Sequence, residues 1–107
     1  MPVSETFKAL GDPVRLEMIR RLSAGSGYTV NRLLEGLGIT RQGARKHLQV
    51  LADVELVHLQ SRGRETEVSL DAAALTIAKS FIADLEAQWD ERLLALRDYV
   101  EKNQKNS

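Results

Sequence analysis

The last third of this 107-residue chain carries a long apolar stripe at helical spacing. Asp71 can cap a helix, and the pattern predicts that one helix continues from there to about Lys102. At about 1.5 Å per residue such a helix is up to about 45 Å long, more than a domain of this size can cover by itself. The stripe residues, which step by four and three, are Ala78, Ile82, Leu85, Trp89, Leu93, Leu96 and Val100.

A nearly heptad stripe is typical of a helix that packs along another helix. The stripe could form the core of the domain itself. However, the earlier helices have apolar faces to bury against each other, and Trp89 and Leu93 lie beyond their reach. We therefore expect antiparallel pairing with a second copy of the chain, in which the first helix also takes part. The expected interface residues are Phe7, Leu10, Ile82, Leu85, Trp89, Leu93 and Leu96.

Two short helices are predicted at the amino terminus. The first runs from Ser4, the expected N-cap, to Leu10, and Gly11 ends it. Asp12 can cap the second helix, and Pro13 has the fixed φ that suits a first helical position. Apolar residues at helical spacing carry this second helix to about Leu22.

Residues 29–53 are predicted to form a helix-turn-helix. Thr29 is the expected cap of a helix of about two turns, which continues to about Leu37. Two glycines follow, and Thr40 is the expected cap of the next helix. Two short helices joined by a tight turn that contains glycine form this motif.

The helix after Thr40 has two unlike faces. Ala44, Leu48 and Leu51 recur at spacings of four and three, so one face can be buried. The other face is cationic and has no acidic residue. Arg and Lys side chains can read guanine edges in a major groove, and Gln can read adenine. The alternative is a solvated surface helix that is basic. The residues on this face are Arg41, Gln42, Arg45, Lys46 and Gln49.

Two strands, at about residues 56–60 and 66–70, are predicted to form a hairpin after this helix. The predicted tip spans residues 61–65 and contains Gly63, where a positive φ is expected. Arg62 and Arg64 lie in the tip and suit the electronegative minor groove or its phosphates. Charged tips also serve solubility, but the neighbouring basic helix favours contact with DNA.

The distribution of charge agrees with a local docking face. The formal net charge is zero, which argues against a general polyanion binder. Residues 40–64 nevertheless contain five Lys or Arg residues against two Asp or Glu residues. The chain also has no cysteine, no apolar run that could span a bilayer and no signal-peptide pattern. We therefore expect a cytoplasmic protein with no membrane partner.

The sequence offers no chemistry for catalysis or for a cofactor. It contains no clustered carboxylates, no Ser/His/Asp arrangement and no glycine-rich phosphate loop, so we expect no catalytic residue and no enzyme. His47 and His58 are single imidazoles on different elements, which predicts no metal site of the usual kind.

The predicted fold is mostly α with a small antiparallel β-hairpin, in a single domain that spans residues 1–107. It is a winged helix-turn-helix domain with the wing at about 56–70, a long terminal dimerisation helix at about 71–102 and a frayed tail at 103–107. Such a domain can bind DNA. The alternative is a winged helix that only contacts other proteins, which the acid-free face and the paired arginines disfavour.

In this order of elements the chain resembles the ArsR/SmtB family of bacterial winged-helix repressors over nearly its whole length. The segments that carry the resemblance are Ala9-Leu10-Gly11-Asp12-Pro13-Val14-Arg15, Leu37-Gly38-Ile39-Thr40-Arg41-Gln42, Lys46-His47-Leu48 with Leu51, Gly63-Arg64, and Trp89-Asp90-Glu91-Arg92-Leu93. The family implies a homodimer that binds double-stranded operator DNA through the basic helix and wing. It also implies repression that an effector relieves, and the sequence leaves open whether this is a small molecule, a partner protein or nothing.

Two copies of residues 40–49 would then occupy successive major grooves, about 34 Å apart. Thr40 and the backbone amides after it are expected to hold a phosphate, and Lys46 to contact the DNA backbone. His47 fits either packing under the wing or a phosphate contact. The residues expected to approach bases are Arg41, Gln42, Arg45 and Gln49.

Three departures from the family pattern matter. Metal-sensing members place thiols or histidines where this chain has Val30 to Leu33 and a terminal helix without histidine, so we predict no metal sensing at those sites. Arg45 stands where a small hydroxyl residue is common, which adds charge to the reading face. Glu55 stands where glycine usually ends the basic helix, which costs about 1 kcal/mol if the backbone there is left-handed.

Overall fold

The structure is a computed structural model that describes residues 2–25 and 27–105. Within that range it contains five helices and a three-stranded antiparallel sheet in the order β1-β3-β2. The elements in chain order are α1 (Val3–Leu10), α2 (Pro13–Ala24), β1 (Tyr28–Thr29), α3 (Val30–Leu33), α4 (Arg41–Asp53), β2 (Val57–Arg62), β3 (Glu65–Leu70) and α5 (Ala72–Lys105).

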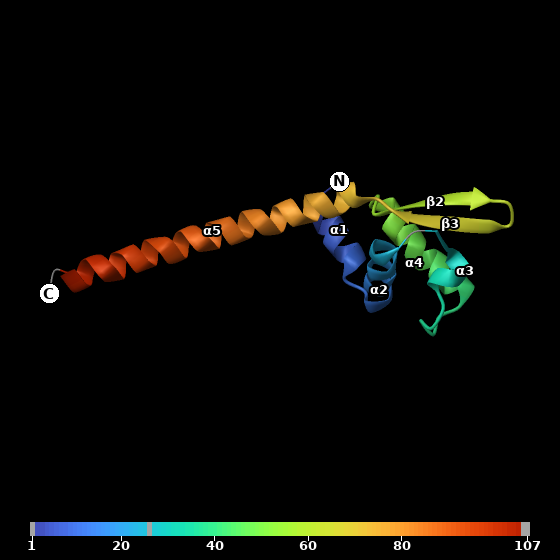
Figure 1. Cartoon of the computed structure of the whole chain (residues 1–107), viewed down its shortest axis with the longest axis horizontal. Coiled ribbons are helices and arrows are strands. Elements are labelled where there is room, and N and C mark those ends of the chain that lie inside the picture. Colours follow the sequence, from blue (N-terminus) through green and yellow to red (C-terminus); the bar gives the residue numbers. More distant parts are fainter. Residues whose placement is uncertain (1, 26, 106–107) are drawn as a thin grey trace.

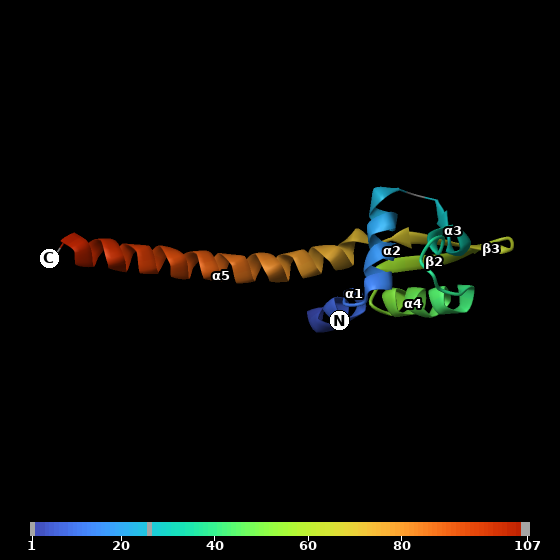
Figure 2. The same ribbon diagram turned by 90° about the horizontal axis from the view of Figure 1, so that it is seen from below.

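Helix α5 leaves the rest of the molecule as a single straight rod (Figure 1). The other elements gather at one end of it, with α2, α3 and α4 on one side and the hairpin of β2 and β3 pointing away from the rod (Figures 1 and 2). Helix α1 lies against the first turns of α5 in both views. The molecule therefore measures 76 × 26 × 22 Å.

The corner between α1 and α2 forms largely as the sequence predicts. The Asp12 carboxylate accepts the N–H groups of Val14 and Arg15 at 2.9 and 3.0 Å, and Pro13 is the first residue of α2. Ser4 is not the cap of α1, so that prediction is wrong. The helix begins one residue earlier, at Val3, because the Pro2 carbonyl already accepts the N–H of Glu5.

The first helix of the helix-turn-helix is shorter than predicted. Thr29 caps it as expected, and its hydroxyl accepts the N–H of Arg32 at 3.2 Å. However, α3 ends at Leu33 instead of continuing to Leu37. Arg21 of α2 explains where the helix stops, because its Nη1 donates to the carbonyls of Leu33 and Glu35 at 2.9 and 2.7 Å.

Glu17 holds the Arg21 side chain in place from one turn earlier in α2. Its carboxylate accepts from Arg20 at 2.6 and 2.8 Å and from Arg21 Nε at 3.2 Å. The hydrogen bonds from Arg20, and then those from Arg21, lower the pKa of Glu17 to about 2. This group of charges thereby fastens α2 to the turn that precedes α4.

The sheet has one more strand than the hairpin predicted from sequence. Tyr28 and Thr29 pair with Val68 and Glu67 of β3, so Thr29 is both a strand residue and a helix cap. A two-residue strand carries no periodicity that a sequence could show. The turn of the hairpin is also tighter than predicted, because Arg62 already pairs with Glu65 and only two residues connect the strands.

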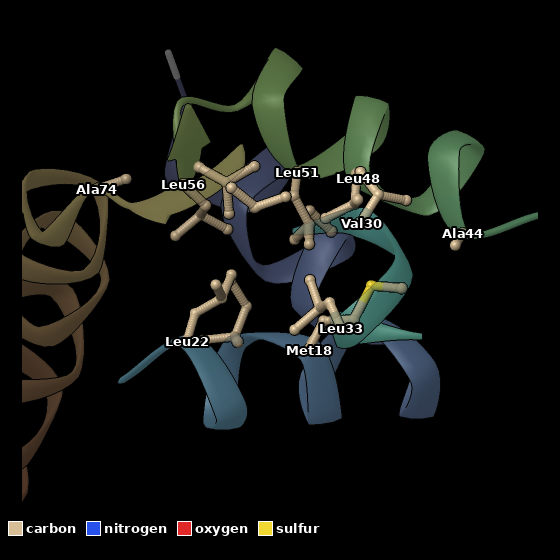
Figure 3. Packing of buried hydrophobic residues seen from close by; sticks show 13 residues of the cluster. Met18, Leu22, Val30, Leu33, Ala44, Leu48, Leu51, Leu56 and Ala74 are labelled. Carbon is tan, nitrogen blue, oxygen red and sulfur yellow. The ribbon is translucent and has the colours of Figure 1, made fainter. Parts of the chain in front are cut away.

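Apolar residues from every helix and strand meet in one core beneath α4 (Figure 3). From β2, only Val57 belongs to this core. Met18 of α2 and Leu33 of α3 pack there against Leu48 and Leu51 of α4. All four side chains are fully buried. Fully burying one such side chain contributes about 1.5–3 kcal/mol, so this core fixes the position of α4.

Helix α5 extends to Lys105, three residues beyond the predicted end. The prediction of a frayed tail is therefore wrong for residues 103–105, and residues 106–107 lie outside the described residues. In the stripe, Ala78 is buried under α1 at 6% exposure. The remaining stripe residues are 44–60% exposed, namely Ile82, Leu85, Trp89, Leu93, Leu96 and Val100.

We predict that Glu55→Gly stabilises the protein. Glu55 follows α4 with φ +63°, and it is the only residue other than glycine with a positive φ in the described chain. Removing its Cβ should relieve about 1 kcal/mol of backbone strain and raise the melting temperature. Thermal unfolding followed by circular dichroism measures the change. Glu55→Ala, which removes the charge but keeps Cβ, is the control and should give no comparable gain.

We also predict a specific acid sensitivity from Glu17. Because its pKa falls from the ordinary 4.5 to about 2 in the folded protein, its contribution to stability is complete above pH 4.5. That contribution should fade as the pH falls from 4.5 to about 2. The free energies of unfolding of the wild type and of Glu17→Gln, measured over this range, should therefore converge toward the acid end. A constant difference would contradict the role given to Glu17.

Candidate nucleic-acid interface

The buried face of α4 decides which side chains point to solvent. Ala44, Leu48 and Leu51 are 0% exposed, as the sequence predicts. The five polar residues predicted for the opposite face are all exposed, namely Arg41, Gln42, Arg45, Lys46 and Gln49. The structure therefore brings them together on one uncovered side of α4.

The amino-terminal end of α4 is capped by a side chain and closely packed. The Thr40 hydroxyl accepts the Gly43 N–H at 3.0 Å, which confirms the predicted cap. A Cβ at position 43 would lie 3.2 Å from that oxygen, so glycine allows the close approach. The N–H groups of this first turn have no intrahelical acceptor and carry the positive end of the helix dipole, which can hold a phosphate.

The residues on the exposed face of α4 differ in whether they already form hydrogen bonds within the chain. Arg41, Gln42 and Arg45 line a shallow hollow at the beginning of α4. Gln49, one turn later, donates from Nε2 to the Asp53 carboxylate at 2.9 Å. Gln49 must give up this hydrogen bond before its amide can contact a base.

His47 lies on the side of α4 that faces the start of α2. Its Nδ1 is 3.1 Å from Nη1 of Arg15 and 3.9 Å from the Asp12 carboxylate. Since a guanidinium can only donate, Nδ1 accepts and the ring proton of neutral His47 is on Nε2. Neither of the two positions predicted for His47, under the wing or on a phosphate, anticipates this contact.

Arg15 connects three helices at this point. Its Nε donates to the Ala9 carbonyl of α1 at 2.6 Å, while its Nη1 reaches His47 of α4. The N–H of Arg15, more than the charges of Arg15 and His47, lowers the pKa of Asp12. Sequence reasoning missed this cluster, although the run Asp12-Pro13-Val14-Arg15 contains its residues.

The two arginines of the wing differ in whether they form an ion pair within the described chain. Arg62 Nε lies 3.4 Å from the Glu67 carboxylate on the neighbouring strand. Arg64 occupies the two-residue turn next to Gly63, which has the predicted positive φ of +59°. Both side chains are exposed, and Arg64 makes no ion pair or hydrogen bond with the residues that the structure describes.

The base of the wing is joined to the start of α5. His58 Nε2 is 2.7 Å from the Asp71 carboxylate, and the Asp71 N–H donates to the Leu56 carbonyl at 2.8 Å. Asp71 also caps α5 as predicted, because it accepts the Ala73 N–H at 2.9 Å. This N–H, followed by His58, lowers the pKa of Asp71. The wing and the rod thus share one junction that sequence reasoning missed.

The predicted dimer residues form two groups. Phe7 and Leu10 of α1 are half-buried beside α5, where the Phe7 ring contacts Phe81 edge-on at 5.7 Å between centroids. The group on α5 is uncovered in this single chain.

Across residues 2–25 and 27–105, no three His, Cys, Asp or Glu side chains are grouped closely enough to hold a metal ion. No helix described by the structure combines the length and apolarity needed to cross a membrane.

Comparison with protein families gives one match for this arrangement. A model described as a helix-turn-helix domain matches residues 10–60, which extend from the end of α1 into β2. A comparison with curated protein sequences finds no match.

Solved structures agree over most of the chain. An ArsR-like transcriptional regulator from Rhodococcus sp. RHA1 is 29% identical, with a TM-score of 0.74 and 90% of each chain covered. An ArsR family transcriptional regulator is 25% identical, with a TM-score of 0.76 and coverage of 81% of this chain and 89% of that one. The repressor BigR from Xylella fastidiosa has the same fold at 24% identity, a TM-score of 0.60 and coverage of 76% and 83%.

The helix-turn-helix, the wing and the long terminal helix therefore have the same order and arrangement in this chain as in those regulators. With the family match over residues 10–60, these similarities confirm the resemblance seen in the sequence. In sequence over residues 10–60 and in fold over most of its length, the chain is thus similar to the winged helix-turn-helix regulators of the ArsR type, which supports a DNA-binding transcriptional regulator.

Proposed function

We propose that this protein is a homodimeric repressor that binds operator DNA with α4 and the wing and pairs through α5. The observation that carries the proposal is the exposed face of α4, where three cationic and two amide side chains project and the nearest acidic side chain is Asp53 beside Gln49. Such a face fits the major groove, whose base edges carry the donors and acceptors that these side chains read.

The side chains on this face take different roles. Arg41, Gln42 and Arg45 line one hollow and approach base edges, because nothing in the described chain holds them back. Lys46 lies farther round the helix and contacts a phosphate. Gln49 can contact a base only after it breaks its hydrogen bond to Asp53, so it contributes least to base recognition among these residues.

Phosphates are held at two further places. At the start of α4, Thr40 and the N–H groups after it receive one phosphate. On the wing, Arg64 reaches the minor groove first, because Arg62 already shares the Glu67 carboxylate. The groove there is narrow and electronegative, which favours an inserted guanidinium.

The homodimer rests on the uncovered stripe of α5. An isolated helix with a continuous apolar face needs a partner, and a second copy supplies the same face by twofold symmetry. Six large side chains from Ile82 to Val100 are between 44% and 60% exposed in the single chain. Two copies paired this way present two α4 helices to one side of a duplex.

Repression fits this geometry, since a dimer that occupies a promoter blocks access to it. BigR, which shares the fold, is a transcriptional repressor. The regulatory signal does not act through the family's usual metal sites, because the chain has no cysteine and α5 has no histidine. The alternatives left by the sequence are a small-molecule effector, a partner protein and no effector at all.

We predict that Arg45→Ala and Lys46→Ala impair DNA binding in different ways. Arg45→Ala should cost about 1–3 kcal/mol on the operator and relax the preference at particular bases. Lys46→Ala should weaken binding to all sequences alike and lower the slope of log affinity against log salt by about 1. Fluorescence anisotropy with operator and scrambled duplexes at several salt concentrations measures both effects.

The control for these variants is Lys102→Ala, which removes the same charge near the far end of α5. It should leave DNA affinity unchanged. If Arg45→Ala also leaves it unchanged, the reading face is wrongly assigned. If the wild type shows no preference among duplexes from a selected library, the domain is a protein-interaction module instead.

We further predict that Leu93→Asp dissociates the dimer. Leu93 is 46% exposed, so the change should leave the single chain folded but place a carboxylate in the paired stripe. An unpaired charge in an apolar interface costs several kcal/mol, which corresponds to more than about a hundredfold in the dissociation constant. Sedimentation equilibrium measures this. Ala87→Asp, on the opposite side of α5, should remain dimeric, and a monomeric wild type would refute the homodimer.

A further inference from the structure

A groove runs between α1 and the first turns of α5, where the two helices lie side by side (Figure 1). It has a volume of about 520 Å³. Its lining is mostly apolar and includes two charged side chains, Lys79 and Glu86. The apolar wall consists of Phe7, Leu10, Leu75, Ala78 and Ile82.

Trp89 lies on the same apolar stripe as Ala78 and Ile82, three turns beyond Ala78. It is 60% exposed and is the only tryptophan of the chain. Its indole is too large to lie unpartnered on a helix without a strong drive to be buried. Along α5, Trp89 lies about 16 Å from Ala78, and it is not among the residues that line the groove in its own chain.

We propose that this groove receives Trp89 of a second copy of the chain. This inference rests on the proposed homodimer and specifies its register. The two α5 helices run antiparallel, with Ala78 opposite Trp89 of the partner subunit and Ile82 opposite Leu85 of the partner subunit. The twofold axis then passes between residues 83 and 84, and each groove holds one indole.

Burial of apolar surface alone does not select this register. The stripe steps by four, three, four, four, three and four, so it reads the same in both directions from Trp89. An antiparallel register centred on Trp89 therefore matches every stripe residue with another, whereas the proposed register leaves Leu96 and Val100 without an opposing stripe residue. In that register, however, the two indoles oppose each other and the apolar groove beside Ala78 receives Val100 of the partner subunit instead. The proposed register pairs the largest side chain with the smallest.

The charges beside the stripe distinguish the two registers more sharply. Lys79, Glu86, Asp90 and Arg97 lie on the same flank of α5, because their spacings of seven, four and seven return to one side of a helix. In the proposed register Lys79 lies near Glu86 and Asp90 of the partner subunit. In the register centred on Trp89, Lys79 lies equally near Arg97 and Glu101 of the partner subunit, and Glu86 faces the partner's Asp90. Opposite charges favour the former, and like charges disfavour the latter.

Disulfide crosslinking tests the register directly, since the chain has no cysteine of its own. A disulfide needs two Cα atoms within about 4.4–6.8 Å, which only facing positions reach. Equal amounts of Ile82→Cys and Leu85→Cys proteins are mixed, allowed to exchange and oxidised. We expect the mixture to form a crosslinked dimer faster than either variant alone. Both variants retain Trp89 and the charges beside it.

The matched mixture of Leu85→Cys with Leu93→Cys probes the register centred on Trp89. We expect little crosslinking, because these positions would lie about 16 Å apart along the axis in the proposed register. Faster crosslinking in this mixture than in the first would overturn the proposal while leaving the homodimer intact. Equally fast crosslinking of each single variant with itself would indicate parallel helices and would overturn it too.

Charge reversal provides an independent measurement. Lys79→Glu should weaken dimerisation severalfold in sedimentation, and adding Glu86→Lys in the same chain should recover most of the loss. Lys79 and Glu86 are seven residues apart and form no ion pair with each other in the described chain, so recovery must act between subunits. Failure of the second change to recover any dimer would overturn the register. A wild type that does not dimerise at all would refute the proposed homodimer itself.

Discussion

The rotational position of α4 is the constraint on which the interface depends. Ala44, Leu48 and Leu51 are fully buried against the core, so the helix cannot turn about its axis without exposing leucine. Exposing even one leucine costs about as much as several surface ion pairs contribute. The cationic face is thus held outward by apolar packing on the other side of the same helix, and its own charges contribute little to that orientation.

Two arginines hold the surroundings of α4 in place from α2. Arg21 binds the carbonyls at the end of α3, and Arg15 connects the end of α1 to His47. Both occupy positions where a surface charge would be the ordinary assumption for an amphipathic helix. Because a guanidinium offers five donors in a rigid fork, each can satisfy groups from several elements at once. These two side chains therefore serve the interface without belonging to it.

The sequence predicts what local chemistry dictates and misses what arises from contacts between distant segments. The caps at Asp12, Thr29, Thr40 and Asp71, the buried face of α4 and the left-handed backbone at Glu55 each follow from a few neighbouring residues. Strand β1, the early end of α3 and the environment of His47 depend on partners elsewhere in the chain. No periodicity or motif could show them, since pattern reasoning sees only local spacing. The roles of the side chains toward DNA remain predictions.

The rod and the interface are coupled through the register of α5. In an antiparallel pair, moving the twofold axis by one residue moves the two winged domains apart by two helical rises, about 3 Å. Successive base pairs are about 3.4 Å apart, so one residue of register corresponds to nearly one base pair of half-site spacing. The apolar stripe pairs with itself completely only about Trp89, so apolar area alone does not select the proposed register. The shape of the groove beside Ala78 and the charges of Lys79 and Glu86 would then determine which operator the two α4 helices can reach together.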